Sequence, residues 1–284
     1  HLMHLGQFSL GAGALVMTES THVTSEGRIS LKCAGMYSDE NEAAMKRVID
    51  FCKKYGVAKH GLQLGHSGRK GSTHPPAAGG QPLKPEEGAY ETIAPSAAPY
   101  APGWHVPRAM TKADIDRVRG AFVDAVRRAI RIGYDLIEMH AGHGYLGHEF
   151  LSPLSNQRTD EYGGSLANRM RFPLETFAAM RAAWPSDKPM GVRISATDWV
   201  EGGWNPDESV VFARELKKLG CDYVDCSSGA LDPRQQLPLA LGYNVPFAER
   251  IRREAGIPTI TVGLITGPRQ CEDIIASGKA DFVC

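Results

Sequence analysis

Two histidines and one tyrosine stand close together in the sequence, at His140, His143 and Tyr145. A neutral imidazole N–H donates a hydrogen bond to a carbonyl oxygen, and a phenol can deliver a proton to a neighbouring atom. The group therefore predicts a site in which His140 and His143 hold a substrate carbonyl beside the acidic proton of Tyr145.

Two other interpretations of this stretch are open. Paired histidines also bind zinc, although the stretch lacks a helical His-Glu-x-x-His pattern and a third ligand at a suitable spacing. The histidines could also be hydrogen-bonded loop residues without a chemical role. We prefer the carbonyl-binding interpretation, in which a phenol stands beside the imidazole pair.

Two further polar residues lie inside apolar stretches that are typical of strands. Burying the cation of Arg193 is costly unless an anion compensates it. That anion could be a neighbouring carboxylate, or it could be an anionic ligand or an electron-rich cofactor ring. Gln63 offers the donor and acceptor that a planar, uracil-like edge requires, but it could equally be a hydrogen-bonded amide of the core.

The elements that must position these residues alternate along the chain. Seven short runs are rich in Val, Ile and Leu and apolar on both faces, which is typical of parallel strands. They are 14–20, 60–66, 134–140, 190–195, 223–228, 258–263 and 281–284. Amphipathic helices are expected between them at 38–55, 111–132, 165–183, 206–219, 245–255 and 268–277. Ser38 and Thr111 are expected to cap the first two of these helices.

This alternation indicates either a doubly wound open sheet or an α/β (β/α)8 TIM barrel. An open nucleotide-binding sheet should carry Gly-x-Gly-x-x-Gly after its first strand, but the early glycines at 11 and 13 precede a strand. We therefore predict one incomplete TIM-barrel domain, 1–284, that lacks strand 1 and everything after strand 8. The Pro- and Gly-rich loop 67–110 would follow strand 3 on the face where barrel active sites lie.

Composition excludes several classes of protein. The chain has 284 residues, with 32 Lys and Arg against 32 Asp and Glu, so it has no electrostatic footprint for nucleic acid or an anionic membrane. No apolar run reaches the length of a membrane-spanning helix. Six scattered cysteines argue against a disulfide framework and a cysteine zinc site, and they indicate a reducing compartment, the cytoplasm.

Three long motifs give the sequence a resemblance. The stretches 60–69 (HGLQLGHSGR), 134–146 (YDLIEMHAGHGYL) and 150–164 (FLSPLSNQRTDEYGG) closely resemble the Old Yellow Enzyme family. These proteins are flavin-dependent ene-reductases on a TIM barrel, and the chain looks most similar to the bacterial xenobiotic-reductase-like branch. The resemblance runs through the whole chain in one register.

The resemblance implies a role for individual residues. Gln63 would bond the pyrimidine edge of FMN, Arg193 would stabilise the reduced flavin at its N1/O2 side, and Ser20 would lie near the ring. Gly263 would belong to the phosphate loop after strand 7. His140 and His143 would hold the substrate carbonyl, and Tyr145 would be the proton donor.

The resemblance also implies an activity. NAD(P)H would reduce FMN, and the reduced flavin would then reduce the activated C=C bond of a small α,β-unsaturated carbonyl compound in a ping-pong cycle. We expect a homo-oligomer without nucleic-acid or membrane partners.

The resemblance has gaps at both ends of the chain. The family's strand-1 motif and its Gly-Arg pair after strand 8 are absent from this sequence, so the chain looks truncated and we expect it to bind FMN weakly. A metal-dependent hydrolase or lyase on the same barrel, and a non-catalytic flavin-binding fragment, are the rival hypotheses.

Overall fold

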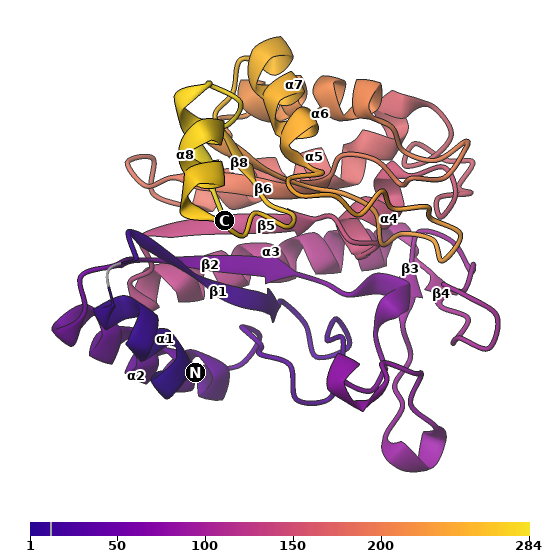
Figure 1. Ribbon diagram of the computed structural model, residues 1–284. Helices are drawn as coiled ribbons and strands as arrows, with labels where there is room; N and C mark the ends of the chain where they lie inside the picture. The colour runs from indigo at the N-terminus through magenta and orange to yellow at the C-terminus, as the bar shows by residue number, and fades with distance from the viewer. Residues whose placement is uncertain (12) are drawn as a thin grey trace.

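A computed structural model describes residues 1–11 and 13–284 of the chain. Its centre is a curled sheet in which all seven strands run parallel, in the order β1-β2-β5-β6-β7-β8-β9 (Figure 1). The strands are β1 (Leu15–His22), β2 (Lys59–Gly65), β5 (Leu136–Ala141), β6 (Met190–Ser195), β7 (Tyr223–Ser227), β8 (Thr259–Thr261) and β9 (Phe282–Val283). The predicted α/β fold, an incomplete TIM barrel of parallel strands, is confirmed.

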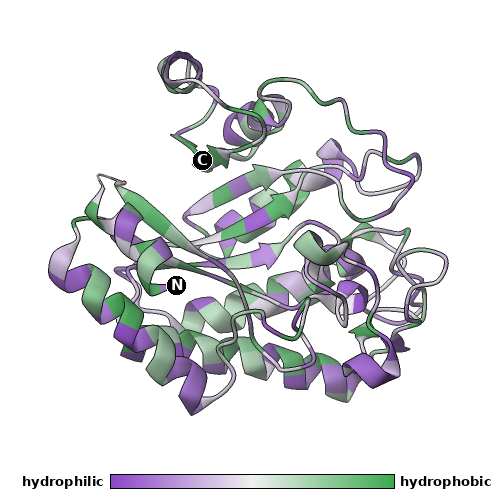
Figure 2. Ribbon diagram, turned by 60° about the horizontal axis from the view of Figure 1, so that its bottom comes forward, coloured by the Kyte–Doolittle hydropathy of each residue, from purple (hydrophilic) through white to green (hydrophobic). Residues whose placement is uncertain are grey.

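Helices connect the strands and pack against one another along the chain. They are α1 (Leu2–Leu10), α2 (Asp39–Tyr55), α3 (Lys112–Ile132), α4 (Leu146–Leu151), α5 (Leu166–Ala183), α6 (Pro206–Lys218), α7 (Val245–Ala255) and α8 (Pro268–Ala276). Neighbouring pairs such as α1 and α2, α3 and α5, and α6 and α7 are in contact. Hydrophobic and hydrophilic residues alternate around these helices (Figure 2), as is usual for helices that cover a sheet on one side.

The helix boundaries follow from local chemistry that the sequence signals. Ser38 Oγ accepts from the backbone N–H of Asn41 at the start of α2. Thr111 and Asp114 form a reciprocal capping box at the start of α3, and such a box satisfies two backbone donors that have no partner inside the helix. Both predicted caps are confirmed.

Strand residues alternate between the helix layer and the interior of the curled sheet. Leu62 and Leu64 of β2 are fully buried in the hydrophobic core, and Gln63 lies between them. Gln63 pairs in register with Glu138, and His140 pairs with Arg193. Because paired residues of parallel strands point to the same face, the polar side chains gather on one face of the sheet.

Several elements were not predicted from the sequence. These are α1, α4 and a small parallel sheet of β3 (Ile93–Ala94) and β4 (Arg108–Ala109). The sheet β3–β4 and three short 3₁₀ turns, at 68–70, 76–78 and 85–87, lie within the loop 67–110. Their sequence signals are weak because each element is short, and those within 67–110 lie in sequence rich in Pro and Gly.

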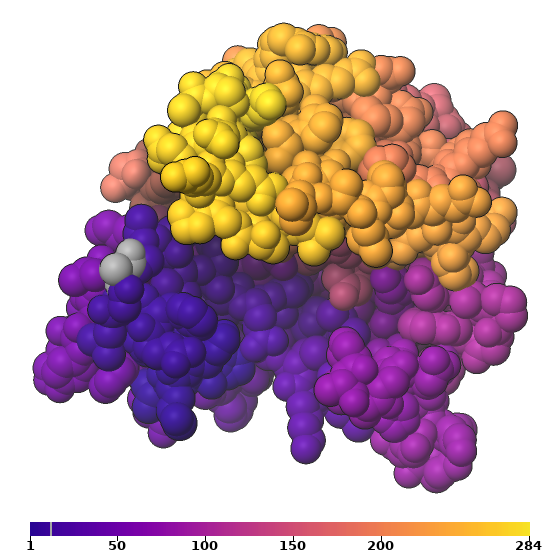
Figure 3. All heavy atoms as spheres, viewed as in Figure 1, coloured from indigo at the N-terminus to yellow at the C-terminus, as the bar shows by residue number. Residues whose placement is uncertain are grey.

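Two strands form the edges of the sheet, β1 and β9. Their parts of the chain come from opposite ends of the sequence, and Figure 3 shows the early residues in indigo below the last residues in yellow. Among the described residues, no strand joins β1 to β9, so the sheet is curled but does not close. No described helix combines the length and the apolar character needed to cross a membrane.

Two glycines test how tightly the interior is packed. A Cβ on Gly191 would overlap the ring of Tyr223, whereas a Cβ on Gly120 would meet nothing within 4 Å. We expect Gly191→Ala to lower the free energy of unfolding by about 1–3 kcal/mol through overpacking. Gly120→Ala, at an exposed position in the middle of α3, should raise it by about 0.5–1 kcal/mol. Urea unfolding of both variants measures the two effects, and equal values would contradict this description of the interior.

Candidate active site

Three residues form the centre of the site at the end of β5. The rings of His140 and His143 lie 5.1 Å apart, centroid to centroid, and the ring of Tyr145 lies 5.1 Å from that of His140. Each pair is nearly perpendicular, at 84° and 88°. The structure therefore brings together the two imidazoles and the phenol that the sequence singles out.

The hydrogen bonds assign the proton positions on the two histidines. Nδ1 of His140 accepts from the backbone N–H of Gly142 at 3.1 Å, so neutral His140 carries its proton on Nε2. That nitrogen lies 3.2 Å from Nδ1 of His143, and Nε2 of His143 lies 2.7 Å from Oγ of Ser227. Both ring N–H groups thus have acceptors, and a substrate carbonyl would have to replace them.

Burial sets the charges of these groups. It lowers the pKa of His143 to about 3, and the positive charges of Arg193 and Lys70 act in the same direction. The pKa of His140 is lowered well below its ordinary value by burial and then by His143. Burial raises the pKa of Tyr145 to about 12. At neutral pH the site therefore holds two neutral imidazoles and a protonated phenol.

Lys70 is a functional candidate that sequence reasoning missed. Its Nζ donates to the backbone oxygens of His143 and Ala230, at 2.9 and 2.8 Å, and lies 5.3 Å from the centroid of the Tyr145 ring. Burial lowers the pKa of this amine to about 8, against the opposing effect of Glu149. Its only sequence signal is its place after the motif that ends at Arg69.

The turn after β5 has an uncommon backbone conformation. His143 has φ +55° and Gly144 has φ +71°. A left-handed conformation costs a residue with a side chain about 1–2 kcal/mol. A Cβ on Gly144 would overlap the carbonyl oxygen of Ala230, so glycine is required there for space as well as for backbone freedom. Such strain, kept at a cluster of polar residues, is typical of a functional site.

A second group of polar residues lies in the interior of the curled sheet. Nε2 of Gln63 donates to Oε1 of Glu138 at 2.7 Å, and Nε of Arg193 lies 3.2 Å from Oδ2 of Asp225. Burial raises the pKa of Glu138 to about 8, and the charge of Asp225 adds to this effect. The neighbouring carboxylate that the sequence offered as one partner for Arg193 is therefore Asp225.

The last two predicted residues lie on β1 and just after β8. Ser20 is on β1, and a Cβ on Gly65 would lie 2.9 Å from Ser20 Oγ and 3.4 Å from Cβ of His140. Gly263 follows β8 with φ +108°, and its carbonyl oxygen accepts from the N–H of Gly242 at 2.9 Å. Ser20 therefore borders the histidine cluster, whereas Gly263 belongs to the turn after β8.

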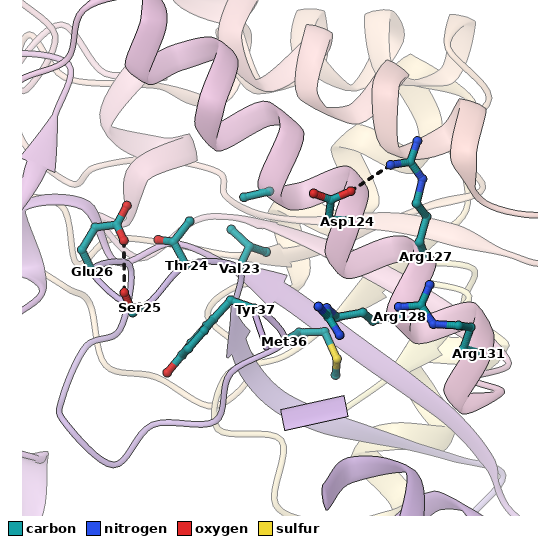
Figure 4. Close-up of a pocket in the computed structure, with 11 residues that line it drawn as sticks. Val23, Thr24, Ser25, Glu26, Met36, Tyr37, Asp124, Arg127, Arg128 and Arg131 are labelled. Carbon is teal, nitrogen blue, oxygen red and sulfur yellow. Dashed lines mark hydrogen bonds and ion pairs between the residues drawn. The ribbon is translucent and has the colours of Figure 1, made fainter. Parts of the chain in front are cut away.

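A separate cavity of about 400 Å³ lies between the loop after β1 and the outer side of α3 (Figure 4). Three arginines line it, but each is paired with a carboxylate: Arg127 with Asp124, Arg128 with Asp39 and Glu42, and Arg131 with Glu42. None of the predicted site residues lines this cavity. It is therefore distinct from the candidate active site.

Among the described residues, no group of three or more His, Cys, Asp or Glu side chains is arranged to hold a metal ion. All six cysteines are free thiols.

A curled parallel sheet that carries polar side chains at the carboxyl ends of its strands is the architecture of the TIM-barrel enzymes. The sequence profile of the NADH:flavin oxidoreductase / NADH oxidase family matches residues 2–284, and the chain belongs to that family. The resemblance to the Old Yellow Enzyme family is thereby confirmed.

Similar proteins in other organisms agree with this assignment. An NADPH dehydrogenase of Geobacillus thermodenitrificans is 44% identical over 283 residues, which cover 100% of this chain and 78% of the relative. An NADPH dehydrogenase of Clostridium acetobutylicum is 40% identical over 284 residues and is covered to 79%. The chain is thus a flavin-dependent oxidoreductase by family.

Solved structures share the fold. Morphinone reductase in complex with tetrahydroNAD superimposes with a TM-score of 0.79 at 25% identity, over 100% of this chain and 76% of that one. Histamine dehydrogenase from Rhizobium sp. 4-9 gives a TM-score of 0.83 at 29% identity, over 100% of this chain and 40% of that one.

FMN is the cofactor of the family, and the residues present suit it. Oγ of Ser20 is buried without a hydrogen-bond partner among the described residues. The Arg193 side chain keeps 26% of its surface exposed beyond its contact with Asp225. The Gln63 amide uses its NH2 group on Glu138, which leaves its carbonyl oxygen as the acceptor for another donor. The flavin is a planar ring with N–H and carbonyl groups, and it becomes anionic on reduction. It could therefore bind the Ser20 hydroxyl, the Arg193 guanidinium and the Gln63 carbonyl oxygen.

Ser227 lies 2.7 Å from Nε2 of His143 and would compete with a substrate carbonyl for that N–H. We expect Ser227→Ala to tighten the binding of a saturated ketone such as cyclohexanone about five-fold, because one hydrogen bond of about 1 kcal/mol no longer has to be broken. Titration of the FMN-loaded protein, followed by flavin absorbance, measures this affinity. Ser228→Ala is the matched control, because Ser228 Oγ bonds Asn244 and Trp199 instead. Weaker binding in Ser227→Ala would contradict the assigned proton positions.

His22 gives the site's strand β1 a pH-dependent stability. Its side chain is buried without a hydrogen-bond partner for either ring nitrogen among the described residues, and burial lowers its pKa to about 3. The unfolded chain therefore binds a proton that the folded chain does not bind between about pH 6.5 and pH 3, so stability falls as the pH falls through this range. We expect His22→Leu to reduce this slope by about 1 kcal/mol per pH unit, measured by urea unfolding. An unchanged slope would contradict the burial of a neutral His22.

Proposed function

We propose that this chain carries the active site of an FMN-dependent NAD(P)H oxidoreductase that reduces the activated C=C bond of α,β-unsaturated carbonyl compounds. The observation that carries the proposal is the packing of the His140, His143 and Tyr145 rings against one another. Family membership supports the redox chemistry, and the cluster supports a carbonyl compound as the oxidising substrate.

The two imidazoles are assigned to the substrate's carbonyl oxygen. Each is neutral and has one N–H, so together they can donate two hydrogen bonds to an oxygen on which negative charge develops. The nearby cations of Arg193 and Lys70, which lower the pKa of His143, would also favour that negative charge. Holding the carbonyl in this way makes the β-carbon of the alkene electron-poor.

Tyr145 is assigned to the α-carbon as the proton donor. A pKa of about 12 keeps the phenol protonated at physiological pH, and the ammonium group of Lys70 over its ring would stabilise the phenolate that remains. When bound, FMN supplies the hydride that it has taken from NAD(P)H. Gln63, Arg193 and Ser20 would hold the ring, and Gly263 would contribute to its phosphate loop.

The proposed setting is that of a small-molecule enzyme. The proposed substrate is an enone. The six free thiols favour a reducing compartment, so we propose the cytoplasm as the location of the enzyme. A homo-oligomer remains our prediction, which sedimentation would test.

The activity is tested by anaerobic spectroscopy of the FMN-loaded protein. NADPH should bleach the flavin absorbance, and cyclohexenone should restore it. Bleaching without recovery would contradict the enone substrate, and bound zinc without flavin binding would favour the hydrolase or lyase alternative.

Tyr145→Phe separates the two half-reactions. We expect it to slow flavin reoxidation by cyclohexenone by about 10²-fold or more, as for loss of a general acid, and to change flavin reduction by NADPH less than about two-fold. Stopped-flow absorbance measures both rates. Tyr134→Phe is the control, because Tyr134 is a buried tyrosine that bonds Thr18 instead. An equal loss in both half-reactions would contradict Tyr145 as the proton donor.

A further inference from the structure

The turn that joins His143 to Tyr145 is held mainly by side chains. Only one backbone hydrogen bond closes it, from the N–H of Tyr145 to the oxygen of Gly142 at 3.1 Å. Oγ of Ser195 accepts from the N–H of His143 at 2.8 Å, and Lys70 donates to the oxygen of His143. The position of the phenol therefore depends also on what holds the remaining backbone N–H of the turn, that of Gly144.

His148 is the residue that binds this peptide group. Its Nδ1 accepts from the N–H of Gly144 at 3.0 Å, and its side chain has no exposed surface. Gly144 is the single residue between the carbonyl-binding His143 and the proton-donating Tyr145. A change at His148 is therefore transmitted mainly to Tyr145, because Ser195 and Lys70 hold the backbone of His143.

Asp198 fixes the orientation of His148. Nε2 of His148 lies 2.8 Å from Oδ1 of Asp198, which is within ion-pair distance but outside the angles of a hydrogen bond, and both side chains are fully buried. Because Nδ1 is used as an acceptor, Nε2 is the ring nitrogen that carries a proton, and it lies on the side of the carboxylate. A buried carboxylate this close to the ring favours that tautomer and opposes rotation of the ring.

Asp198 is itself held by two buried donors. Oγ of Ser152 and the backbone N–H of Trp204 donate to its Oδ2, at 2.6 and 2.7 Å. Asp198 follows β6, whereas His148 belongs to α4, so the pair connects the end of one strand to the turn after its neighbour. Neither residue belongs to the His140, His143 and Tyr145 cluster.

We propose that His148 and Asp198 are a positioning pair that fixes the turn carrying His143 and Tyr145, and thereby directs the phenol at the substrate. This inference rests on the proposed function for the role of Tyr145. The pair acts through Gly144 and contacts neither substrate nor cofactor. Its contribution should therefore appear in the half-reaction that needs the phenol.

The first experiment compares substitutions of His148 in the FMN-loaded protein. His148→Leu removes both contacts, whereas His148→Gln keeps an acceptor for Gly144 and a donor for Asp198. We expect His148→Leu to slow flavin reoxidation by cyclohexenone about ten-fold or more and flavin reduction by NADPH less than about two-fold, with His148→Gln within about three-fold of the parent protein. His60→Leu is the matched control, because His60 is a buried histidine of β2 that bonds Ser9 of α1. It should leave the ratio of the two rates unchanged.

A double-mutant cycle distinguishes positioning from general loss of structure. On a Tyr145→Phe background, His148→Leu should cause less than about a two-fold further loss, because the phenol that it positions is gone. A ten-fold further loss there, or an equal loss in both half-reactions, would overturn the proposal. If His148→Leu does not fold, Asp198→Asn replaces it in the same cycle.

Amide exchange provides a readout that does not depend on the reaction. The N–H of Gly144 should exchange with solvent about ten-fold or more faster in His148→Leu than in the parent protein or in His148→Gln. Unchanged exchange would overturn the proposal. If Tyr145→Phe alone leaves reoxidation intact, the proposed function fails, whereas faster exchange at Gly144 would still support the structural role of the pair.

Discussion

The parallel pairing of β5 with β6 is the interaction on which the site depends. It places His140 opposite Arg193 and Ala141 opposite Ile194, while the pairing of β6 with β7 places Arg193 opposite Asp225. Because side chains alternate between faces, a slip of one residue would turn His140 into the hydrophobic layer and bring Met139 into the interior. The hydrophobic side chains of the same strands oppose that slip, since Ile137, Met139 and Val192 are buried against the helices.

Burial of polar groups at this end of the sheet sets their chemistry. Burial favours the uncharged form of each ionisable group in the interior. It therefore raises the pKa of acids such as Glu138 and lowers the pKa of bases such as the histidines. Burial raises the pKa of Glu138 and lowers the pKa of both imidazoles, while the guanidinium of Arg193 lies beside Asp225. The result is a group of neutral hydrogen-bond donors next to a cation, which suits an oxygen that gains negative charge during a reaction.

Much of the fold could be predicted because its signals are local and repeated. Strand β6, for example, was predicted at 190–195 and is found at Met190–Ser195. Like the other strands, it is a short apolar run, and an amphipathic helix separates it from the next strand. Helix α1 had no such support, since it has no capping side chain and no charged residue in its first or last turn. The short helix α4 was missed because its six buried residues lack the exposed polar face that marks an amphipathic helix.

The site was predictable as a set of residue types but not as a network. His140, His143 and Tyr145 are close in sequence, so their meeting needs only one turn. The partners that define their protonation come from elsewhere: Ser227 lies 84 residues from His143 along the chain, and Lys70 lies 73 residues away. Such partners depend on the order of strands in the sheet, which no single stretch of sequence contains.

These partners divide the site into a fixed part and an exchangeable part. The backbone of the turn after β5 is held at each of its peptide groups from 143 to 145, by Ser195, His148 and the oxygen of Gly142. The imidazole N–H groups, by contrast, are bonded to another imidazole and to a hydroxyl, and each N–H could donate to a carbonyl oxygen instead. In the proposed reaction, a substrate carbonyl would therefore bind the histidines while the phenol keeps its place, because the exchange involves the ring contacts and the position of the turn involves the backbone. This separation explains why a strained turn is useful here: its conformation need not change when the histidines change partners.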